Sequence, residues 1–236
     1  MRSRLARVRE DHVSLGSPRV HLRRTDSTNV RARELAADGA PHGTLVTAGE
    51  QLAGRGRQGR VWSAPAGRAL LGSLVLRDPP RLLPLAAGVA VAELVGPRAR
   101  IKWPNDVLVD QRKVAGILVE GRPQEGWAVL GIGLNVAVHA EDFPPELRDT
   151  AGTLGLTSDA IEPTLARLLE LLPRWIGAEP EAVLGATRAR DALLDQRVRW
   201  AGGSGHGAGI DADGRLLVTT GSGQVALRAG EVHLVR

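Results

Sequence analysis

Residues 102–120, KWPNDVLVDQRKVAGILVE, constrain the fold more tightly than any other segment of the chain. Aliphatic β-formers lie on both sides of the polar turn at residues 110–112, which predicts two strands joined by a tight turn. The only two lysines among the 31 basic residues, Lys102 and Lys113, also lie here. The Lys side chain ends in a compact point charge, whereas the Arg side chain ends in a wide planar fork. In a chain that otherwise uses Arg, two lysines in one segment therefore suggest a chemical need for Lys at these positions. The competing explanation is compositional drift. A lysine beside a turn at the start of a strand is held precisely, which favours a functional role for Lys113.

Length and composition bound the architecture. A chain of 236 residues forms one large domain, or a main domain with a small module, and buries about 70–75% of its unfolded surface. The hydrophobic fraction of 43% is that of an ordinary globular protein. The sequence has five Trp, one Phe and no Tyr, so we expect a core of Leu, Val, Ala and Ile.

Several classes of site are excluded or disfavoured. A sequence without Cys excludes disulfides, thiolate catalysis and cysteine-ligated zinc, and the six His lack the spacing of a zinc motif. Residues 1–9 are rich in Arg but are not followed by the apolar stretch of a signal peptide, and the longest uncharged apolar run, residues 82–92, is too short to span a bilayer. We therefore expect a soluble, cytoplasmic protein. The net charge of +5 favours anionic ligands without requiring nucleic acid.

The first elements are a predicted strand at residues 18–24 and a predicted helix at residues 30–38, closed by Gly39. A short polar run stands at the N-terminus of this helix: Ser27, Thr28 and Asn29. These residues form either an ordinary N-cap or one side of a site for a small polar ligand, and the local sequence leaves both interpretations open.

A loop rich in glycine and arginine follows a predicted strand at residues 45–47. Its glycines, Gly54, Gly56 and Gly59, match the pattern G-x-G-x-x-G. A dinucleotide-binding site would need a helix directly afterwards, but residues 62–67, WSAPAG, do not form one, so we reject that interpretation. The loop also carries Arg55, Arg57 and Arg60. Three interpretations remain: an anion clamp that orders on binding, a solvated basic loop, and an Arg-Gly contact with nucleic acid.

Four further segments predict a scaffold. Residues 69–77 and 127–138 read as strands, residues 81–95 as an Ala/Leu/Val helix, and apolar residues recur at helical spacing through residues 165–176. Strands that pair mostly with near neighbours, together with helices, predict an α+β domain with a mixed sheet, which we assign to residues 1–192.

The sequence pattern changes from about Gln196 onward. Short β runs separated by Gly-rich turns predict a small SH3-like barrel at residues 193–236. The runs are residues 198–200, 207–210, 216–220, 224–227 and 232–235. Residues 211–214, DADG, are typical of a hairpin turn rather than of a calcium loop, whose other ligands are missing. Residues 202–209, GGSGHGAG, are unusually loose for such a module.

Taken together, four motifs resemble those of biotin–protein ligases in their order and spacing. They are Ser27-Thr28-Asn29, then Gln51 with GRGRQGR and Trp62, then KWPND…KVAGILVE, then GIGLN at residues 131–135. The resemblance implies a catalytic domain of the biotin/lipoate ligase type followed by the SH3-like module. It also implies that biotin reacts with ATP, in the presence of Mg²⁺, to form biotinyl-5′-AMP. In that family the biotinyl group then passes to a lysine of a biotin carboxyl carrier protein.

The resemblance also assigns roles to residues. Lys113 matches the lysine that reaches the ligand carboxylate and the phosphate, where two anions must meet. Catalysis is thus assigned to Lys113, Arg55 and Arg57. The two arginines match loop residues that close over the ligand. Biotin binding is assigned to these three and to Ser27, Thr28, Asn29, Gln51, Gly56 and Gly116. Trp62, which would shield the closed loop, and Lys102, Asn105, Asp106 and Asn135 are assigned to the ATP side. No protein residue is assigned as a metal ligand, and no enzyme nucleophile is needed.

Two alternatives stay open. A lipoate ligase shares the fold and the adenylation chemistry, although Gln51 and the GRGRQGR loop argue against it, and stabilisation by lipoate but not by biotin would favour it. An Arg-Gly nucleic-acid-binding module without catalysis would show an affinity for oligonucleotides that falls steeply with salt. For the ligase we expect a carrier protein as partner and neither nucleic acid nor membrane. Monomer and homodimer are both compatible with the sequence.

We predict that the protein does not bind an operator. Some biotin–protein ligases repress biotin genes through an N-terminal helix-turn-helix, and the 26 residues before Ser27 are too few for those helices. A gel-shift experiment with and without biotin tests this expectation, and sequence-specific, biotin-dependent retention of DNA would contradict it.

Overall fold

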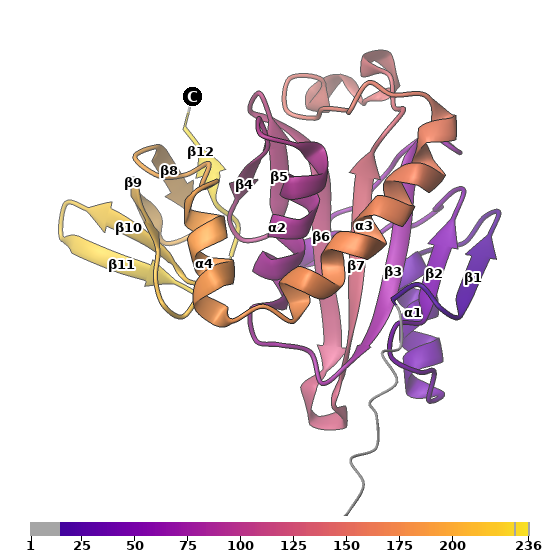
Figure 1. Cartoon of the computed structure of the whole chain (residues 1–236). Coiled ribbons are helices and arrows are strands. Elements are labelled where there is room, and N and C mark those ends of the chain that lie inside the picture. The colour runs from indigo at the N-terminus through magenta and orange to yellow at the C-terminus, as the bar shows by residue number, and fades with distance from the viewer. Residues whose placement is uncertain (1–14, 229, 236) are drawn as a thin grey trace, which may run out of the picture.

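The computed structural model describes residues 15–228 and 230–235, so the Arg-rich start at residues 1–9 lies outside the described residues. A seven-stranded sheet in the order β1-β2-β3-β7-β6-β5-β4 forms the centre of the molecule (Figure 1). Its strands are β1 Arg19–Leu22, β2 Leu45–Ala48, β3 Ala69–Arg77, β4 Arg100–Lys102, β5 Asp106–Val109, β6 Arg112–Arg122 and β7 Trp127–Asn135. β1 and β2 are parallel and the other neighbours antiparallel, so the predicted mixed sheet is confirmed.

The two faces of this sheet are covered differently because side chains alternate along each strand. On β7, Leu130, Ile132 and Leu134 face the main core under α2 (Leu83–Val95) and α3 (Ile161–Ile176). Val129, on the opposite face, packs with α1 (Thr28–Ala37). Figure 1 shows α2 and α3 in front of the sheet and α1 on its other side. The buried core is built mainly of Leu, Val, Ala and Ile, as the composition predicts.

The C-terminal module contains a second sheet, in the order β11-β10-β9-β8-β12. Its strands are β8 Arg197–Trp200, β9 Gly203–Ile210, β10 Leu216–Thr220, β11 Gly223–Leu227 and β12 His233–Leu234, preceded by α4 Pro180–Arg188. The predicted small β module is confirmed, although the sheet order does not close into a complete barrel. The boundary at residue 192 stays a prediction, because Leu82, Leu85 and Trp103 share one hydrophobic cluster with Val198 and Leu216 of the module.

The glycine-rich segment at residues 202–209 is not loose, contrary to the sequence-based expectation. Most of it forms β9, which pairs with both β8 and β10. A Cβ at Gly205 would collide with the Thr219 carbonyl oxygen, and a Cβ at Gly207 with the Leu193 carbonyl oxygen. These glycines therefore permit close approach of neighbouring backbones, which is a structural role that glycine also has within strands.

Most predicted elements are present, with shifted ends. α1 begins two residues earlier than expected, α2 two residues later, and β7 ends at Asn135 rather than at residue 138. The short elements β4 and α4 were not predicted, because three strand residues and nine helical residues with an internal Gly185 carry little periodic signal. Residues 211–214 form the turn between β9 and β10, as expected. No helix within the described residues is long and apolar enough to cross a membrane.

We predict that Leu130→Ala destabilises the protein by about 3 kcal/mol, because a fully buried side chain at the centre of β7 is replaced by a cavity. Leu156→Ala is the control, since Leu156 is 48% exposed, and it should cost less than about 1 kcal/mol. Urea unfolding followed by circular dichroism measures both values, and equal losses would contradict the assignment of the core.

Candidate functional site

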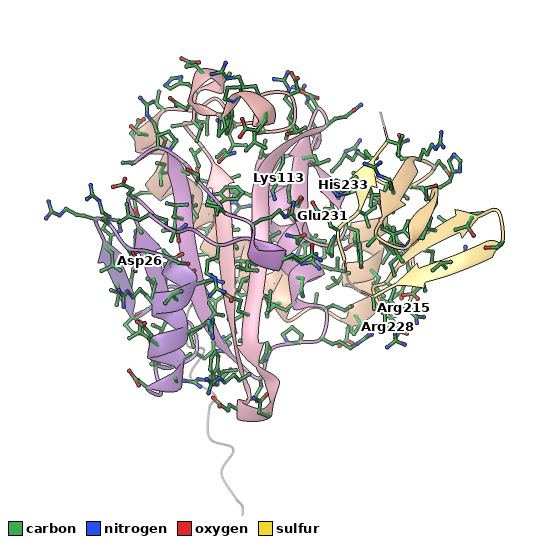
Figure 2. The ribbon with its side chains drawn as sticks, turned by 180° about the vertical axis from the view of Figure 1, so that it is seen from behind. Asp26, Lys113, Arg215, Arg228, Glu231 and His233 are labelled. Carbon is green, nitrogen blue, oxygen red and sulfur yellow. The ribbon has the colours of Figure 1, made fainter. Side chains whose placement is uncertain are left out.

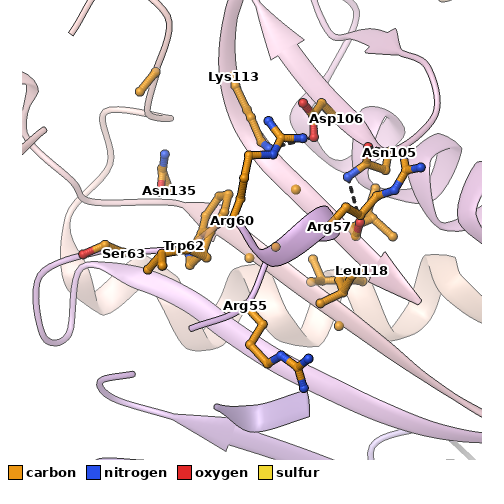
Figure 3. Close-up of a pocket in the computed structure, with 18 of the residues that line it drawn as sticks. Arg55, Arg57, Arg60, Trp62, Ser63, Asn105, Asp106, Lys113, Leu118 and Asn135 are labelled. Atoms are coloured by element: carbon orange, nitrogen blue, oxygen red, sulfur yellow. Dashed lines mark hydrogen bonds and ion pairs between the residues drawn. The ribbon is translucent and has the colours of Figure 1, made fainter. Parts of the chain in front are cut away.

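A cavity of about 680 Å³ opens on the sheet face opposite α2 and α3 (Figure 3). Every residue assigned to the site from the sequence lines this cavity: Ser27, Thr28, Asn29, Gln51, Arg55, Gly56, Arg57, Trp62, Lys102, Asn105, Asp106, Lys113, Gly116 and Asn135. They come from the N-cap and first turn of α1, from the loop after β2, from β4 and the turn after it, and from β5, β6 and β7. Residues nearly 110 positions apart thus form one wall.

The floor of the cavity is sheet backbone. Gly116 on β6 and Gly133 on β7 are register partners, and their missing side chains leave room for Trp62. A Cβ on Gly133 would lie 2.5 Å from Trp62 Cε2, and one on Gly116 would lie 3.0 Å from Trp62 Cζ3. The indole therefore lies flat against the strands beneath the loop that carries it, as Figure 3 shows.

A one-residue irregularity turns Lys113 toward the cavity. Between β5 and β6, Val107 pairs with Ala115 and Leu108 with Lys113, so β6 has one extra residue at this point. Such an insertion changes the face to which the following side chain points, and bulges of this kind are frequent beside active sites. Lys113 Nζ lies 2.7 Å from Asp106 Oδ1 and 5.6 Å from the centroid of the Trp62 ring.

The polar run at the start of α1 is not an ordinary N-cap. Ser27 occupies the N-cap position but makes no capping hydrogen bond with its side chain. Gln51 takes that role: its Oε1 accepts from the Thr28 backbone N–H at 2.7 Å and from Thr28 Oγ1 at 2.9 Å. Since the amide of Gln51 caps the helix, the Ser27 hydroxyl remains at the cavity wall for a ligand.

Asn29 is held entirely by protein groups. Ser73 Oγ donates to Asn29 Oδ1 at 2.6 Å, and Asn29 Nδ2 donates to Glu120 Oε2 at 2.9 Å. The side chain also packs directly on the backbone of Gly131, where a Cβ would collide with it. Asn29 therefore orders the wall, and its direct contact with biotin stays a prediction.

The arginine-rich loop is attached to three different elements. Arg55 pairs with Glu120 of β6 at 3.4 Å, Arg57 donates to Asn105 Oδ1 at 3.1 Å, and Arg60 pairs with Glu231 at 2.7 Å. The loop contains one short 3₁₀ turn, Arg57–Gly59, and no α-helix follows it, which confirms the rejection of a dinucleotide-binding motif. Its ordering on ligand binding stays a prediction.

The C-terminal module reaches the cavity through the residues around β12 and not through the glycine-rich segment. Glu231, His233 and Leu234 line the cavity, and Figure 2 shows the first two near Lys113. Sequence reasoning missed Glu231, because its position depends on how the module packs against the sheet. It also missed Ser73 and Glu120, although Glu120 ends the segment that contains both lysines.

Positive charge is concentrated at one end of the cavity. Burial lowers the pKa of the Lys102 ammonium, the attraction of Asp106 opposes that change, and repulsion from Lys113 adds to it. Burial likewise lowers the pKa of the Arg57 guanidinium, against the attraction of Asp106. Cations that lose solvation without full compensation favour the arrival of an anion.

Two buried polar atoms at the wall have no hydrogen-bond partner among the described residues: Asn135 Oδ1 and Trp62 Nε1. Such atoms are costly unless a ligand or water satisfies them, so they mark positions for polar ligand groups. Within the same part of the chain, no group of three or more His, Asp or Glu side chains is placed to hold a metal ion. Magnesium, however, is commonly bound by one or two carboxylates together with substrate phosphates, and Asp106 is a carboxylate that lines the cavity.

Comparison with known proteins gives consistent matches. Residues 21–136 match the family described as Biotin/lipoate A/B protein ligase family. The chain is 37% identical to the biotin--[acetyl-CoA-carboxylase] ligase of Mycobacterium tuberculosis, over 89% of this chain and 86% of that protein. It is 38% identical to the enzyme of the same name from Paracoccus denitrificans, over 89% and 98%. The structure of the biotin protein ligase from Aquifex aeolicus in complex with biotin and ATP matches with a TM-score of 0.78 and 30% identity, covering 92% of this chain and 98% of that one.

We predict that Lys102→Met stabilises the unliganded protein at pH 7 by about 0.5 kcal/mol after allowance for solvent screening, because a poorly solvated charge is removed. The pKa of Lys102 is lower in the folded than in the unfolded protein. The wild type therefore gains stability as the pH rises between these two values, and the advantage of the variant shrinks toward pH 10. Urea unfolding at several pH values measures the difference, and a variant less stable than wild type at pH 7 would contradict this account.

Proposed function

This chain belongs to the Biotin/lipoate A/B protein ligase family, and on that premise we propose that it joins biotin to ATP and transfers the biotinyl group to a lysine of a biotin carboxyl carrier protein. One observation carries the proposal: a single cavity combines uncharged hydrogen-bonding groups at the start of α1 with a group of cations around Lys113. A neutral ring system with a carboxylate tail matches the first, and a nucleotide triphosphate the second.

At the uncharged end, the ureido group of biotin would meet Ser27, Thr28 and Gln51. A buried ureido group needs a hydrogen-bond partner for each polar atom, and these side chains supply both donors and acceptors. Gly116 would let the rest of biotin approach the strand backbone, and Trp62, which packs on Gly116, would shield the closed loop on the ATP side.

At the cationic end, the biotin carboxylate would attack the α-phosphate of ATP, so that a carboxyl–phosphate bond forms and the bond to the leaving pyrophosphate breaks. Both reactants are anionic, so the step depends on positive charge that is already in place. Lys113 belongs to this cationic group and would exchange its ion pair with Asp106 for the developing charge. Arg55 and Arg57 would close the loop over biotin and the adenylate.

The nucleotide would be held by Lys102, Asn105 and Asn135, the last through its unpartnered Oδ1. Mg²⁺ would enter with the ATP phosphates and would supply charge neutralisation there. Asp106, which pairs with Lys113, would be the carboxylate available to hold it.

In the second half-reaction, the neutral amine of the acceptor lysine would attack the carbonyl carbon of biotinyl-5′-AMP, AMP would leave, and the amine proton would pass to solvent. The mixed anhydride is already activated, so no enzyme nucleophile is required. The partner is therefore a biotin carboxyl carrier protein, and we propose that the chain acts in the cytoplasm, where ATP is available. Independence from nucleic acid and the choice between monomer and homodimer stay predictions.

We predict that Lys113→Ala lowers the rate of carrier biotinylation by about 10²–10³-fold, as expected when one preorganised charge is removed from the reacting groups. Lys113→Arg should restore only a small part, because the guanidinium is wide and planar. The assay contains the protein, biotin, MgATP and a carrier domain, and the mass of the carrier is read.

The control for this assay is Arg122→Ala, whose exposed side chain pairs with Glu125 and does not line the cavity. A biotin-sized gain that survives Lys113→Ala would keep the ligase and overturn the role of Lys113. A lipoate-sized gain, with lipoate in place of biotin, would identify the other branch of the family. If no carrier is modified under any condition, the proposed function is wrong.

A further inference from the structure

Glu120 lies behind the cavity wall at the meeting point of three segments. It is on β6, and its side chain is 19% exposed. Its carboxylate accepts from Asn29 Nδ2 at 2.9 Å and pairs with Arg33 and Arg55, each at 3.4 Å. Among the described residues, the lining of the cavity includes Asn29 and Arg55 but not Glu120. Its carboxylate therefore acts on residues of the site rather than on the space that a ligand would fill.

The orientation of this carboxylate is set by a buried chain of hydrogen bonds. Ser73 is fully buried on β3, and because an amide oxygen only accepts, its hydroxyl proton is donated to Asn29 Oδ1. The nitrogen of the same amide is thereby directed at Glu120. Close packing of Asn29 on the Gly131 backbone prevents the amide from shifting. Glu120 is thus held on one side by Asn29 of α1 and offers its remaining charge to the arginines.

We propose that Glu120 is a positioning residue that docks the first arginine of the loop, Arg55, before the ligand arrives. This inference rests on the proposed function, in which Arg55 closes over biotin. Figure 3 shows Arg55 directed away from the group formed by Arg60, Lys113 and Asp106, toward the other end of the cavity. The Arg55–Glu120 pair fixes the start of the loop at that end, while Arg57 and Arg60 are attached elsewhere.

Docking the loop in advance should strengthen biotin binding, because less conformational freedom remains to be lost on closure. The size of the effect is bounded by exposure: Arg55 is 46% exposed, and ion pairs of this kind contribute up to about 1 kcal/mol, or about fivefold in affinity. A contact that acts before the chemical step should change the affinity for biotin and leave the rate at saturating biotin unchanged.

Glu120→Gln tests the proposal with little change of shape. The amide oxygen of Gln can still accept from Asn29, whereas the negative charge facing Arg55 is lost. We expect the dissociation constant for biotin, measured by calorimetry, to rise about three- to fivefold. Without ligand, trypsin should cleave the loop of the variant, after Arg55, Arg57 or Arg60, faster than it cleaves the loop of wild type. The rate of pyrophosphate release at saturating biotin and MgATP should stay within about twofold. Raising the salt concentration to about 1 M should bring wild type close to the variant, since it screens the partly exposed pair.

Glu34→Gln is the matched control, because Glu34 pairs with Arg31 on the outer side of α1 and both side chains are about half exposed. It should leave biotin affinity and loop cleavage unchanged. A double-mutant cycle with Arg55→Gln separates positioning from a general structural effect: if Glu120 acts through Arg55, the double variant binds biotin no more weakly than Arg55→Gln alone.

The outcomes distinguish this inference from the proposed function. If the wild type does not bind biotin, the proposed function fails. If the wild type binds biotin while Glu120→Gln matches it in affinity and in loop cleavage, the positioning role is overturned. Additive losses in the double-mutant cycle would also overturn it, because Glu120 would then act independently of Arg55.

Discussion

The site depends on a region of sheet surface that has no side chains. Gly116 on β6 and Gly133 on β7 are register partners on adjacent strands, and Gly131 lies on the same face of β7 as Gly133. Their backbone forms a floor on which Trp62 and Asn29 pack directly, at distances that a Cβ would forbid. The opposite face of these strands carries the fully buried Leu130 and Leu134, which hold the floor flat against the main core. One strand pair thus supplies both the rigidity of the fold and the space for a ligand.

Charge is arranged around this floor with a clear polarity. The uncharged hydrogen-bonding groups at the start of α1 lie at one end, and the cations that have lost solvation, Lys102 and Arg57, lie at the other. Lys113 lies near Lys102 and Asp106, and one extra residue in β6 turns its side chain to the cavity. The C-terminal module contributes Glu231, whose pair with Arg60 joins the loop to a part of the chain remote in sequence. A ligand that spans the cavity would therefore contact groups from both parts of the protein.

Local patterns predicted the strands around the turn at residues 110–112 and the long helices, because these depend on short-range periodicity. The site residues were assigned through the resemblance of four motifs to those of biotin–protein ligases, and all of them line the cavity. What could not be predicted depends on tertiary packing. The irregularity that directs Lys113, the capping of α1 by Gln51 and the approach of Glu231 all join segments distant in sequence. The glycine-rich strand β9 was read as loose because glycine is usually a sign of loops, whereas here neighbouring backbones require it.

The central claim is that biotin and ATP react within one cavity of this protein and that the product, biotinyl-5′-AMP, stays bound there. Native mass spectrometry of the protein incubated with biotin and MgATP, without any carrier, tests this most directly. The account predicts a one-to-one complex whose added mass is that of biotinyl-5′-AMP, with pyrophosphate released into solution. Biotin and intact ATP bound side by side with no pyrophosphate, or no retained ligand, would contradict it.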